Sequence, residues 1–216
     1  MITTETIKMI KTRLNKGSLY IVSAPSGTGK TTILKELLNN ISGIKESVSY
    51  TTRKPRNGEI NDISYTFINT DEFMEMMKKE EFIEWAKVHG NFYGTSIKRI
   101  ENILNEGYDV ILDIDTQGAL QLKTKFNNAC YIFILPPSMD ALKERLLKRG
   151  GVIDDTALQR LENAKKEIEM ADQYDYIIIN DNLLNAVKEV ETIVISNRLR
   201  KDTINPQWIK TNFLQD

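Results

Sequence analysis

The sequence lacks several features that would define other classes of protein. It has a single cysteine, Cys130, which lies in the apolar run 129–135 and has no partner for an internal disulfide. We therefore expect a buried thiol in a protein of the reducing cytosol. The first sixteen residues contain no signal-peptide core, and no stretch is apolar over a length that could span a membrane. These absences predict a cytoplasmic protein without a membrane partner.

The sequence also has no excess of positive or negative charge. Lysine and arginine number 29 against 30 acidic residues, so the formal net charge is −1. No global basic field would attract nucleic acid, and the basic residues must act by their positions. The 216 residues suffice for one core with an inserted subdomain, but not for two large domains. Length and composition agree with a small soluble enzyme.

A glycine-containing loop between a predicted strand and a predicted helix carries the strongest signal. The apolar run 19–23 leads into the loop, and the helical pattern of 32–38 follows it without a break. This order is typical of the phosphate-binding loop of nucleoside triphosphate enzymes, whose backbone N–H groups converge on polyphosphate oxygens. The predicted nucleotide-binding residues here are Ala24, Pro25, Ser26, Gly27, Thr28, Gly29, Lys30, Thr31 and Thr32.

Individual residues of this loop have distinct expected roles. Gly27 and Gly29 let the backbone approach phosphate oxygens without a Cβ in the way. Lys30 supplies a mobile positive charge, and the Thr31 hydroxyl is placed to ligate Mg²⁺. The strict pattern has glycine where this chain has Ala24, and alanine fits there if its φ is negative. A turn that merely joins strand and helix would give no reason for Lys and then Thr to begin the helix.

Apolar strands alternating with helices predict a parallel sheet covered by helices on both faces. The predicted strands are 19–23, 46–51, 64–68, 82–86, 109–113, 131–135 and 176–180, and the predicted helices are 32–38, 72–79, 97–105, 118–125, 139–148, 156–171 and 184–197. Residues 53–95 interrupt the alternation with turn chemistry, short strands and a helix that Asp71 would cap. We therefore expect an α/β fold with a phosphate-loop core and an inserted mixed α/β subdomain. Ligands should bind at the carboxyl ends of the core strands.

Four further segments resemble guanylate kinases. They are 49–59 (SYTTRKPRNGE), 81–85 (EFIEW), 90–95 (GNFYGT) and 111–118 (ILDIDTQG). With the loop, the likeness covers roughly residues 17–198. It implies one kinase domain over 1–216, divided into a core of about 17–48, 96–148 and 172–198, a GMP-binding insert of about 49–95 and a short lid of about 149–165.

The resemblance implies direct phosphoryl transfer from MgATP to GMP, and to dGMP in addition. Arg53 and Arg56 flank a proline-rigidified turn, a geometry suited to gripping a monophosphate with forked guanidinium donors. By resemblance, the hydroxyls of Tyr65 and Tyr93 contact the same phosphate. The alternative for the two arginines is a solvated turn with surface charge.

The resemblance also implies how the base is bound. Guanine presents adjacent N1–H and N2–H₂ donors, which carboxylates can accept. Glu84 and Asp115 resemble the family's residues for this role, with the Ser49 and Thr95 hydroxyls supporting the base edge. The alternative is that the alternation of the strand simply points Glu84 at solvent. Without the resemblance, the two alternatives would be about even.

The remaining predicted residues would act on the transferred phosphoryl group and the ATP base. Asp113 ends a buried strand where related enzymes hold Mg²⁺, and by resemblance it helps to orient GMP. Asn180 resembles the family's adenine contact. Arg145, Arg149 and Arg160 resemble its lid arginines, although any one of them could be an ordinary surface residue. The predicted catalytic set is Lys30, Arg53, Asp113, Arg145, Arg149 and Arg160, and the predicted metal ligands are Thr31 and Asp113.

Two rival functions remain at this point. One is a non-catalytic binding module built on a guanylate kinase-like domain, which usually has a degraded phosphate loop and neighbouring domains. The intact Lys30 and Thr31, with a length that leaves no room for neighbours, argue against it. The other is a kinase for a sugar phosphate, which would not need Glu84 and Asp115. The sequence leaves a homo-oligomer open.

Overall fold

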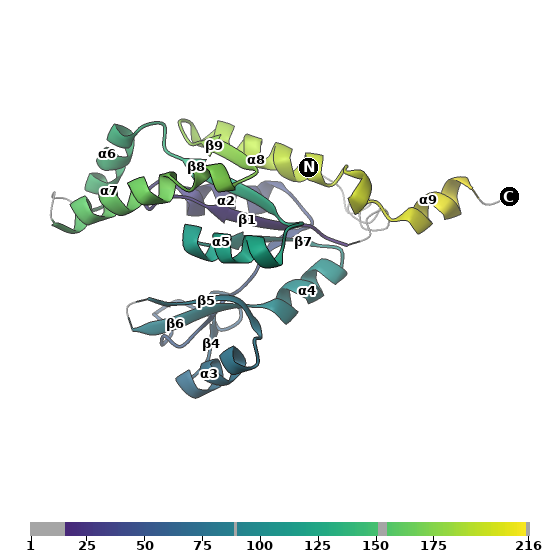
Figure 1. The fold of residues 1–216 in the computed structure, drawn as a ribbon, viewed down its shortest axis with the longest axis horizontal. Coiled ribbons are helices and arrows are strands. Elements are labelled where there is room, and N and C mark those ends of the chain that lie inside the picture. Colours follow the sequence, from purple (N-terminus) through teal and green to yellow (C-terminus); the bar gives the residue numbers. More distant parts are fainter. Residues whose placement is uncertain (1–15, 89, 151–154, 215–216) are drawn as a thin grey trace.

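The computed structural model describes residues 16–88, 90–150 and 155–214. Its strands are β1 (Leu19–Ser23), β2 (Ile44–Glu46), β3 (Tyr50–Thr51), β4 (Thr66–Phe67), β5 (Phe82–Val88), β6 (Asn91–Ser96), β7 (Asp109–Asp113), β8 (Cys130–Leu135) and β9 (Tyr176–Ile179). Its helices are α2 (Lys30–Asn40), α3 (Thr70–Lys78), α4 (Ile97–Asn105), α5 (Thr116–Lys125), α6 (Met139–Gly150), α7 (Asp155–Ile168), α8 (Leu183–Asn197) and α9 (Pro206–Phe213). Figure 1 shows the insert, with α3 and strands β4 to β6, set off from the core sheet.

The core is a five-stranded parallel sheet in the order β2-β7-β1-β8-β9, as the alternating pattern predicts. The central strand β1 pairs with β7 on one side and β8 on the other. Val22 of β1 lies in register with Asp113 of β7. The carboxyl ends of these strands therefore bring the phosphate loop and Asp113 to the same edge of the sheet.

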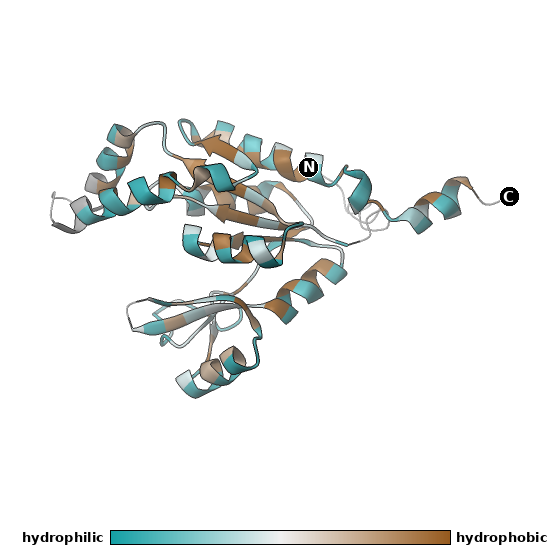
Figure 2. Cartoon of the chain, viewed as in Figure 1, coloured by the Kyte–Doolittle hydropathy of each residue, from teal (hydrophilic) through white to brown (hydrophobic). Residues whose placement is uncertain are grey.

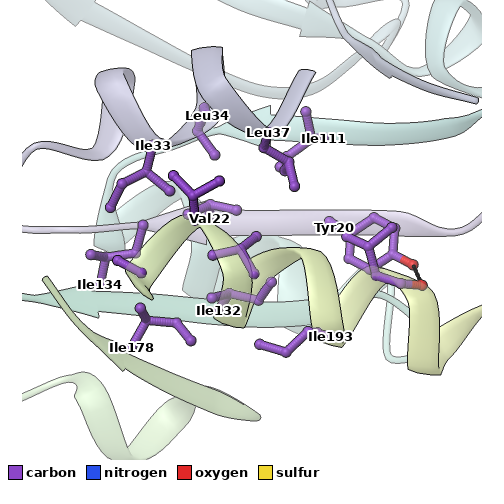
Figure 3. Packing of buried hydrophobic residues seen from close by; sticks show 14 of the residues in the cluster. Tyr20, Val22, Ile33, Leu34, Leu37, Ile111, Ile132, Ile134, Ile178 and Ile193 are labelled. Carbon is purple, nitrogen blue, oxygen red and sulfur yellow. Dashed lines mark hydrogen bonds between the residues drawn. The ribbon is translucent and has the colours of Figure 1, made fainter. Parts of the chain in front are cut away.

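Alternate residues of β1 supply two separate hydrophobic layers. Tyr20 and Val22 pack with α2 and α8, whereas Leu19 and Ile21 pack with α4 and α5. Figure 3 shows the first layer, with Tyr20 and Val22 among isoleucines and leucines of the neighbouring elements. In Figure 2 the core strands are hydrophobic, and the helices around them carry both hydrophobic and hydrophilic residues. Such burial stabilises the fold by about 1.5–3 kcal/mol for each large apolar side chain.

The insert is a second sheet with its own aromatic core. Its strand order is β4-β3-β6-β5, with antiparallel pairing of β6 to both β3 and β5. Phe73 of α3 is fully buried, and its ring stacks on Phe82 at 4.4 Å and on Phe92 at 5.4 Å between centroids. This cluster fixes β5 and β6, the two strands that carry Glu84 and Thr95.

The strand predicted for 46–51 is wrong, because the segment divides between two sheets. Its beginning belongs to β2 of the core and its end to β3 of the insert. Residues 47–49 between them form the first connection from core to insert. The predicted strand 64–68 shortens to β4, and β6, which was not predicted, pairs with both β3 and β5.

Two smaller predictions are also wrong. Asn69, rather than Asp71, caps α3 by accepting from the Glu72 N–H, and Glu72 completes a capping box. Helix α5 begins two residues before Gly118, because Asp115 caps it. Trp85 of β5 is 47% exposed. By contrast, Cys130 is buried, as predicted.

No helix within the described ranges combines the length and the apolar character that a bilayer crossing requires.

Candidate active site

The phosphate loop owes its shape to two glycines with positive φ. Gly27 has φ 91° and Gly29 has φ 102°, conformations that side chains rarely adopt. A Cβ at Gly27 would lie 2.8 Å from Leu146 of α6, and one at Gly29 would lie 2.7 Å from the Asn180 amide nitrogen. Ala24 is not among the described non-glycine residues with positive φ, so alanine is tolerated there.

Lys30 begins α2 and reaches across the end of the sheet. Its ammonium forms an ion pair with Asp113 and donates to the Ile114 carbonyl at 3.3 Å. Thr31 and Thr32 follow in the first turn of α2, and the Thr32 N–H donates to the Gly29 carbonyl at 3.1 Å. The first backbone N–H groups of a helix lack acceptors one turn before them. The helix start can therefore bind an anion beside a lysine.

Asn180 and Arg145 hold the other side of the loop. The Asn180 amide donates to the Thr28 carbonyl at 2.7 Å. The Arg145 guanidinium donates to the same carbonyl and to the carbonyl of Asn180, both at 2.9 Å. Arg145 is thus tied to the core beside the loop, although it was predicted as a lid residue. Arg160 is exposed on α7, and the Arg149 side chain lies outside the described part of the structure.

Glu84, Thr95 and Ser49 form a hydrogen-bonded row on the insert. The Thr95 hydroxyl donates to Glu84 Oε1 at 2.7 Å and lies 3.2 Å from the Ser49 hydroxyl. Burial raises the pKa of Glu84, and the nearby Asp115 carboxylate adds to this shift, while the Thr95 hydrogen bond opposes it. The Glu84 side chain is partly buried and contacts Thr95.

Asp115 brings a second carboxylate close to Glu84. Its Oδ1 accepts from the Gly118 N–H at 2.8 Å, which makes it the N-cap of α5. A Cβ at Gly118 would lie 3.5 Å from Asp115 Oδ1 and 3.9 Å from Glu84 Oε2. The missing side chain at Gly118 therefore leaves room for both carboxylates on one small patch between core and insert.

Arg53 is surrounded by polar and aromatic groups of the insert. Its Nη2 donates to Glu59 Oε1 at 2.7 Å, and its guanidinium lies 5.5 Å from the Tyr65 ring centre. The ring centres of Tyr65 and Tyr93 are 5.9 Å apart. The bond to Arg53, with one from the Arg56 N–H, lowers the pKa of Glu59. Arg53, Tyr65 and Tyr93 thus come together, whereas the Arg56 side chain is exposed.

One cavity of about 570 Å³ joins the two halves of the predicted site. Its core wall includes Thr31 and Asp113, and its insert wall includes Tyr65 and Thr95. Ser49 lies on the connection between the two parts. Residues predicted to act on ATP therefore face residues predicted to act on GMP across the same space.

The donor atoms at the sheet edge fit Mg²⁺. Thr31 offers a hydroxyl oxygen and Asp113 a carboxylate, and both line the cavity. Within the described residues, no group of three or more His, Cys, Asp or Glu side chains could hold a metal by itself. Mg²⁺ usually keeps few protein ligands and shares phosphate oxygens with its substrate.

The structure adds three carboxylates to the predicted site. Glu59 binds Arg53, and Glu46 lines the cavity near Asp113, which together with burial raises the pKa of Glu46. Burial raises the pKa of Glu167 of α7, and the charge of Lys30 opposes this shift. Glu59 lies within a motif segment, so the sequence could have suggested it. Glu46 and Glu167 lie in ordinary strand and helix patterns, which give no such signal.

Comparisons with known proteins identify the family. The family model for guanylate kinase matches residues 16–197. A guanylate kinase of Geobacter metallireducens is 50% identical over 185 residues, which are 86% of this chain and 91% of that protein. One of Thermotoga maritima is 47% identical over 185 residues, covering 86% and 89%. The crystal structure of guanylate kinase from Anaplasma phagocytophilum matches with a TM-score of 0.71 at 29% identity, covering 94% of this chain and 99% of that one. The chain belongs to the guanylate kinase family.

Proposed function

We propose that the chain transfers the γ-phosphoryl group of ATP to GMP and releases ADP and GDP. The observation that carries this proposal is the shared cavity, in which Thr31 and Asp113 face Tyr65 and Thr95. A donor at the phosphate loop and an acceptor on the insert would therefore meet without a covalent enzyme intermediate. We propose an in-line reaction, and dGMP as a second acceptor.

The donor triphosphate lies along the loop residues 24–32, with its terminal phosphates at the start of α2. Backbone N–H groups and Lys30 bind the phosphate oxygens there. Thr31 and Asp113 would hold Mg²⁺, which when bound supplies positive charge to the phosphate oxygens. Asn180 and Arg145 fix the Thr28 carbonyl, and we assign the adenine contact to this side of the loop.

The acceptor phosphate lies at Arg53, with Arg56, Tyr65 and Tyr93 as further donors. Glu59 holds the Arg53 guanidinium in place at 2.7 Å. A planar fork fixed in this way is suited to two phosphate oxygens. Arg56 is exposed, so we propose that it turns toward the phosphate when GMP binds.

Guanine is read by Glu84 and Asp115, with Ser49 and Thr95 beside them. The Thr95 hydroxyl already donates to Glu84 Oε1, which fixes the rotation of that carboxylate. Its other oxygen and Asp115 are then available for the N1–H and N2–H₂ donors of the base. Asp113 helps to orient GMP in addition to its role toward the metal.

Charge that develops on the transferred group is stabilised by Lys30 and Arg53, with Arg145, Arg149 and Arg160 from the lid side. This requires the parts to approach one another. We therefore propose the division into core (17–48, 96–148 and 172–198), GMP-binding insert (49–95) and lid (149–165). A homo-oligomer and a cytoplasmic location remain predictions.

The test is ADP release from ATP in the presence of GMP, AMP, IMP, UMP or a ribose bisphosphate. The proposal predicts strong, Mg²⁺-dependent release with GMP and GDP as the second product. Release with the ribose bisphosphate alone would indicate a sugar-phosphate kinase. Nucleotide binding without ADP release for any of these acceptors would indicate a binding module.

A further inference from the structure

An arginine outside the predicted site binds two segments that border the active-site cavity. Arg99 lies in the first turn of α4, the helix that leads from β6 of the insert back to the core (Figure 1). Its Nη1 donates to the Val48 carbonyl at 3.0 Å and to the Thr66 hydroxyl at 2.7 Å, and its Nη2 donates to Asp62 Oδ1 at 3.2 Å. None of the metal, base or phosphate contacts proposed above uses this side chain.

The helix that carries Arg99 is fixed on the core. Ile100 and Leu104 of α4 are buried in the hydrophobic layer that contains residues of β1 and β7. Ser96 caps the helix by accepting from the Arg99 N–H at 3.4 Å. The guanidinium also lies 4.9 Å from the centre of the Tyr50 ring, a distance at which an aromatic face attracts a cation. Arg99 is therefore held on the core side and reaches toward the insert.

The partners of Arg99 lie directly beside two residues of the predicted GMP site. Val48 precedes Ser49, and Thr66 follows Tyr65. The Thr66 N–H donates to the Ser49 carbonyl at 2.9 Å, which joins the two segments. Ser49 and Tyr65 line the cavity, whereas Arg99 is not among the described residues around it. Arg99 would therefore act on a bound nucleotide through these neighbours.

Asp62 connects Arg99 to the turn before Tyr65. Asp62 has φ 61°, a left-handed conformation that is uncommon for a residue other than glycine. Its N–H donates to the Tyr65 carbonyl at 2.9 Å, and its Oδ1 accepts from the Thr66 hydroxyl at 2.7 Å. The same oxygen accepts from Arg99, so one network links the turn to α4. Because the ion pair itself is exposed and contributes little, the hydrogen bonds of this network carry the positioning.

We propose that Arg99 is a positioning residue for GMP, which holds Ser49 and Tyr65 in place through forked hydrogen bonds to the residues next to them. This inference rests on the proposed function, because it takes these two residues to contact GMP. Both chain connections between core and insert, 47–49 and the step from β6 to α4, meet at this one guanidinium. Loss of the guanidinium would release both connections and let the GMP contacts adopt a wider range of positions.

The test compares Arg99→Ala, Arg99→Lys and Lys98→Ala in the full chain. Lys98 precedes Arg99 on α4 and is exposed, so Lys98→Ala serves as the matched control. GMP affinity is measured by titration calorimetry without ATP, and kcat and both KM values by ADP release. Arg99→Ala should weaken GMP binding and raise the KM for GMP by about tenfold, with a KM for ATP within about twofold of wild type. Arg99→Lys offers a point charge in place of the fork and should recover at most part of the GMP affinity.

Four results would overturn the proposal. They are wild-type GMP affinity in a folded Arg99→Ala, equal rises of the two KM values, tighter GMP binding in that variant, and wild-type GMP affinity in Arg99→Lys. The last of these decides the matter if Arg99→Ala does not fold. A wild-type protein that binds GMP but gives no GDP from ATP would contradict the proposed function, whereas a loss of GMP affinity in Arg99→Ala would still support this inference.

Discussion

Lys30 of the phosphate loop forms an ion pair with Asp113, the last residue of β7. The pair joins the start of α2 to the end of the strand beside β1. The Lys30 ammonium contacts both the Asp113 carboxylate and the Ile114 carbonyl. Phosphate and Mg²⁺ would redistribute these contacts, because the phosphate attracts Lys30 and the metal attracts Asp113. We propose that the pair holds both groups in place before nucleotide binds.

Lys30→Ala should lower kcat by about hundredfold or more, because a positive charge at the transferring phosphate is lost. The fold should persist, since the Lys30 side chain contributes no core packing. Lys35→Ala, on an exposed position of the same helix, is the matched control. Steady-state kinetics and circular dichroism measure the effect. Near-normal kcat in folded Lys30→Ala would refute the role of the loop.

Arg53→Lys should raise the KM for GMP by about tenfold or more, because a point charge cannot replace a fork held by Glu59. The KM for ATP should change less than twofold, since the donor site is on the core. Lys54→Ala removes a neighbouring exposed cation and should behave as wild type. Equal changes in both KM values would argue against a phosphate site at Arg53.

Arg198→Ala should destabilise the fold without changing the site. Arg198 binds the buried Asp109 at 2.7 Å and donates to the Ser42 carbonyl at 3.0 Å. Removal of one partner of a buried pair usually costs about 3–5 kcal/mol. Arg200→Ala breaks an exposed pair with Asp202 and should cost less than about 1 kcal/mol. Urea unfolding compares the two, and equal losses would contradict this account.

The KM for GMP should rise as the pH falls. The pKa of Glu84 lies above its ordinary value, chiefly because of burial. As the pH drops through this raised pKa, the carboxylate gains a proton and loses an acceptor for guanine. The KM for ATP should not follow this change. A pH profile of both constants tests it, and parallel profiles would exclude Glu84 as the source.

Much of the core could be predicted from the sequence, because local signals there agree with the tertiary structure. An apolar run such as 109–113 that lies between two helical patterns is typical of a buried strand of a parallel sheet. Helix α4 has the predicted bounds, and Gly107 follows it with φ 78°. The insert was harder, because β3 and β4 contain two residues each and exist only through pairing.

The candidate site also has one part that the sequence predicts and another part that it does not. Thr31 of the loop, Asp113 and the insert residues Tyr65 and Thr95 line one cavity. The fixation of Arg145 on two backbone carbonyls depends on packing between α6, α7 and the loop. No spacing within either helix records such a contact. Side chains that meet only through tertiary structure need coordinates to be found.

The most direct test is the ratio of kcat/KM for GMP to that for AMP, in the wild type and in Glu84→Gln. AMP offers an unprotonated N1 and a C2–H to Glu84 and Asp115, and such unpaired polar groups can discriminate by roughly 10⁴ to 10⁵. IMP, which keeps N1–H but lacks the amino group, should fall between the two. The account predicts that Glu84→Gln loses most of this ratio through a higher KM for GMP, with the KM for ATP nearly unchanged. Equal use of AMP and GMP by the wild type, or an equal ATP defect in the variant, would contradict it.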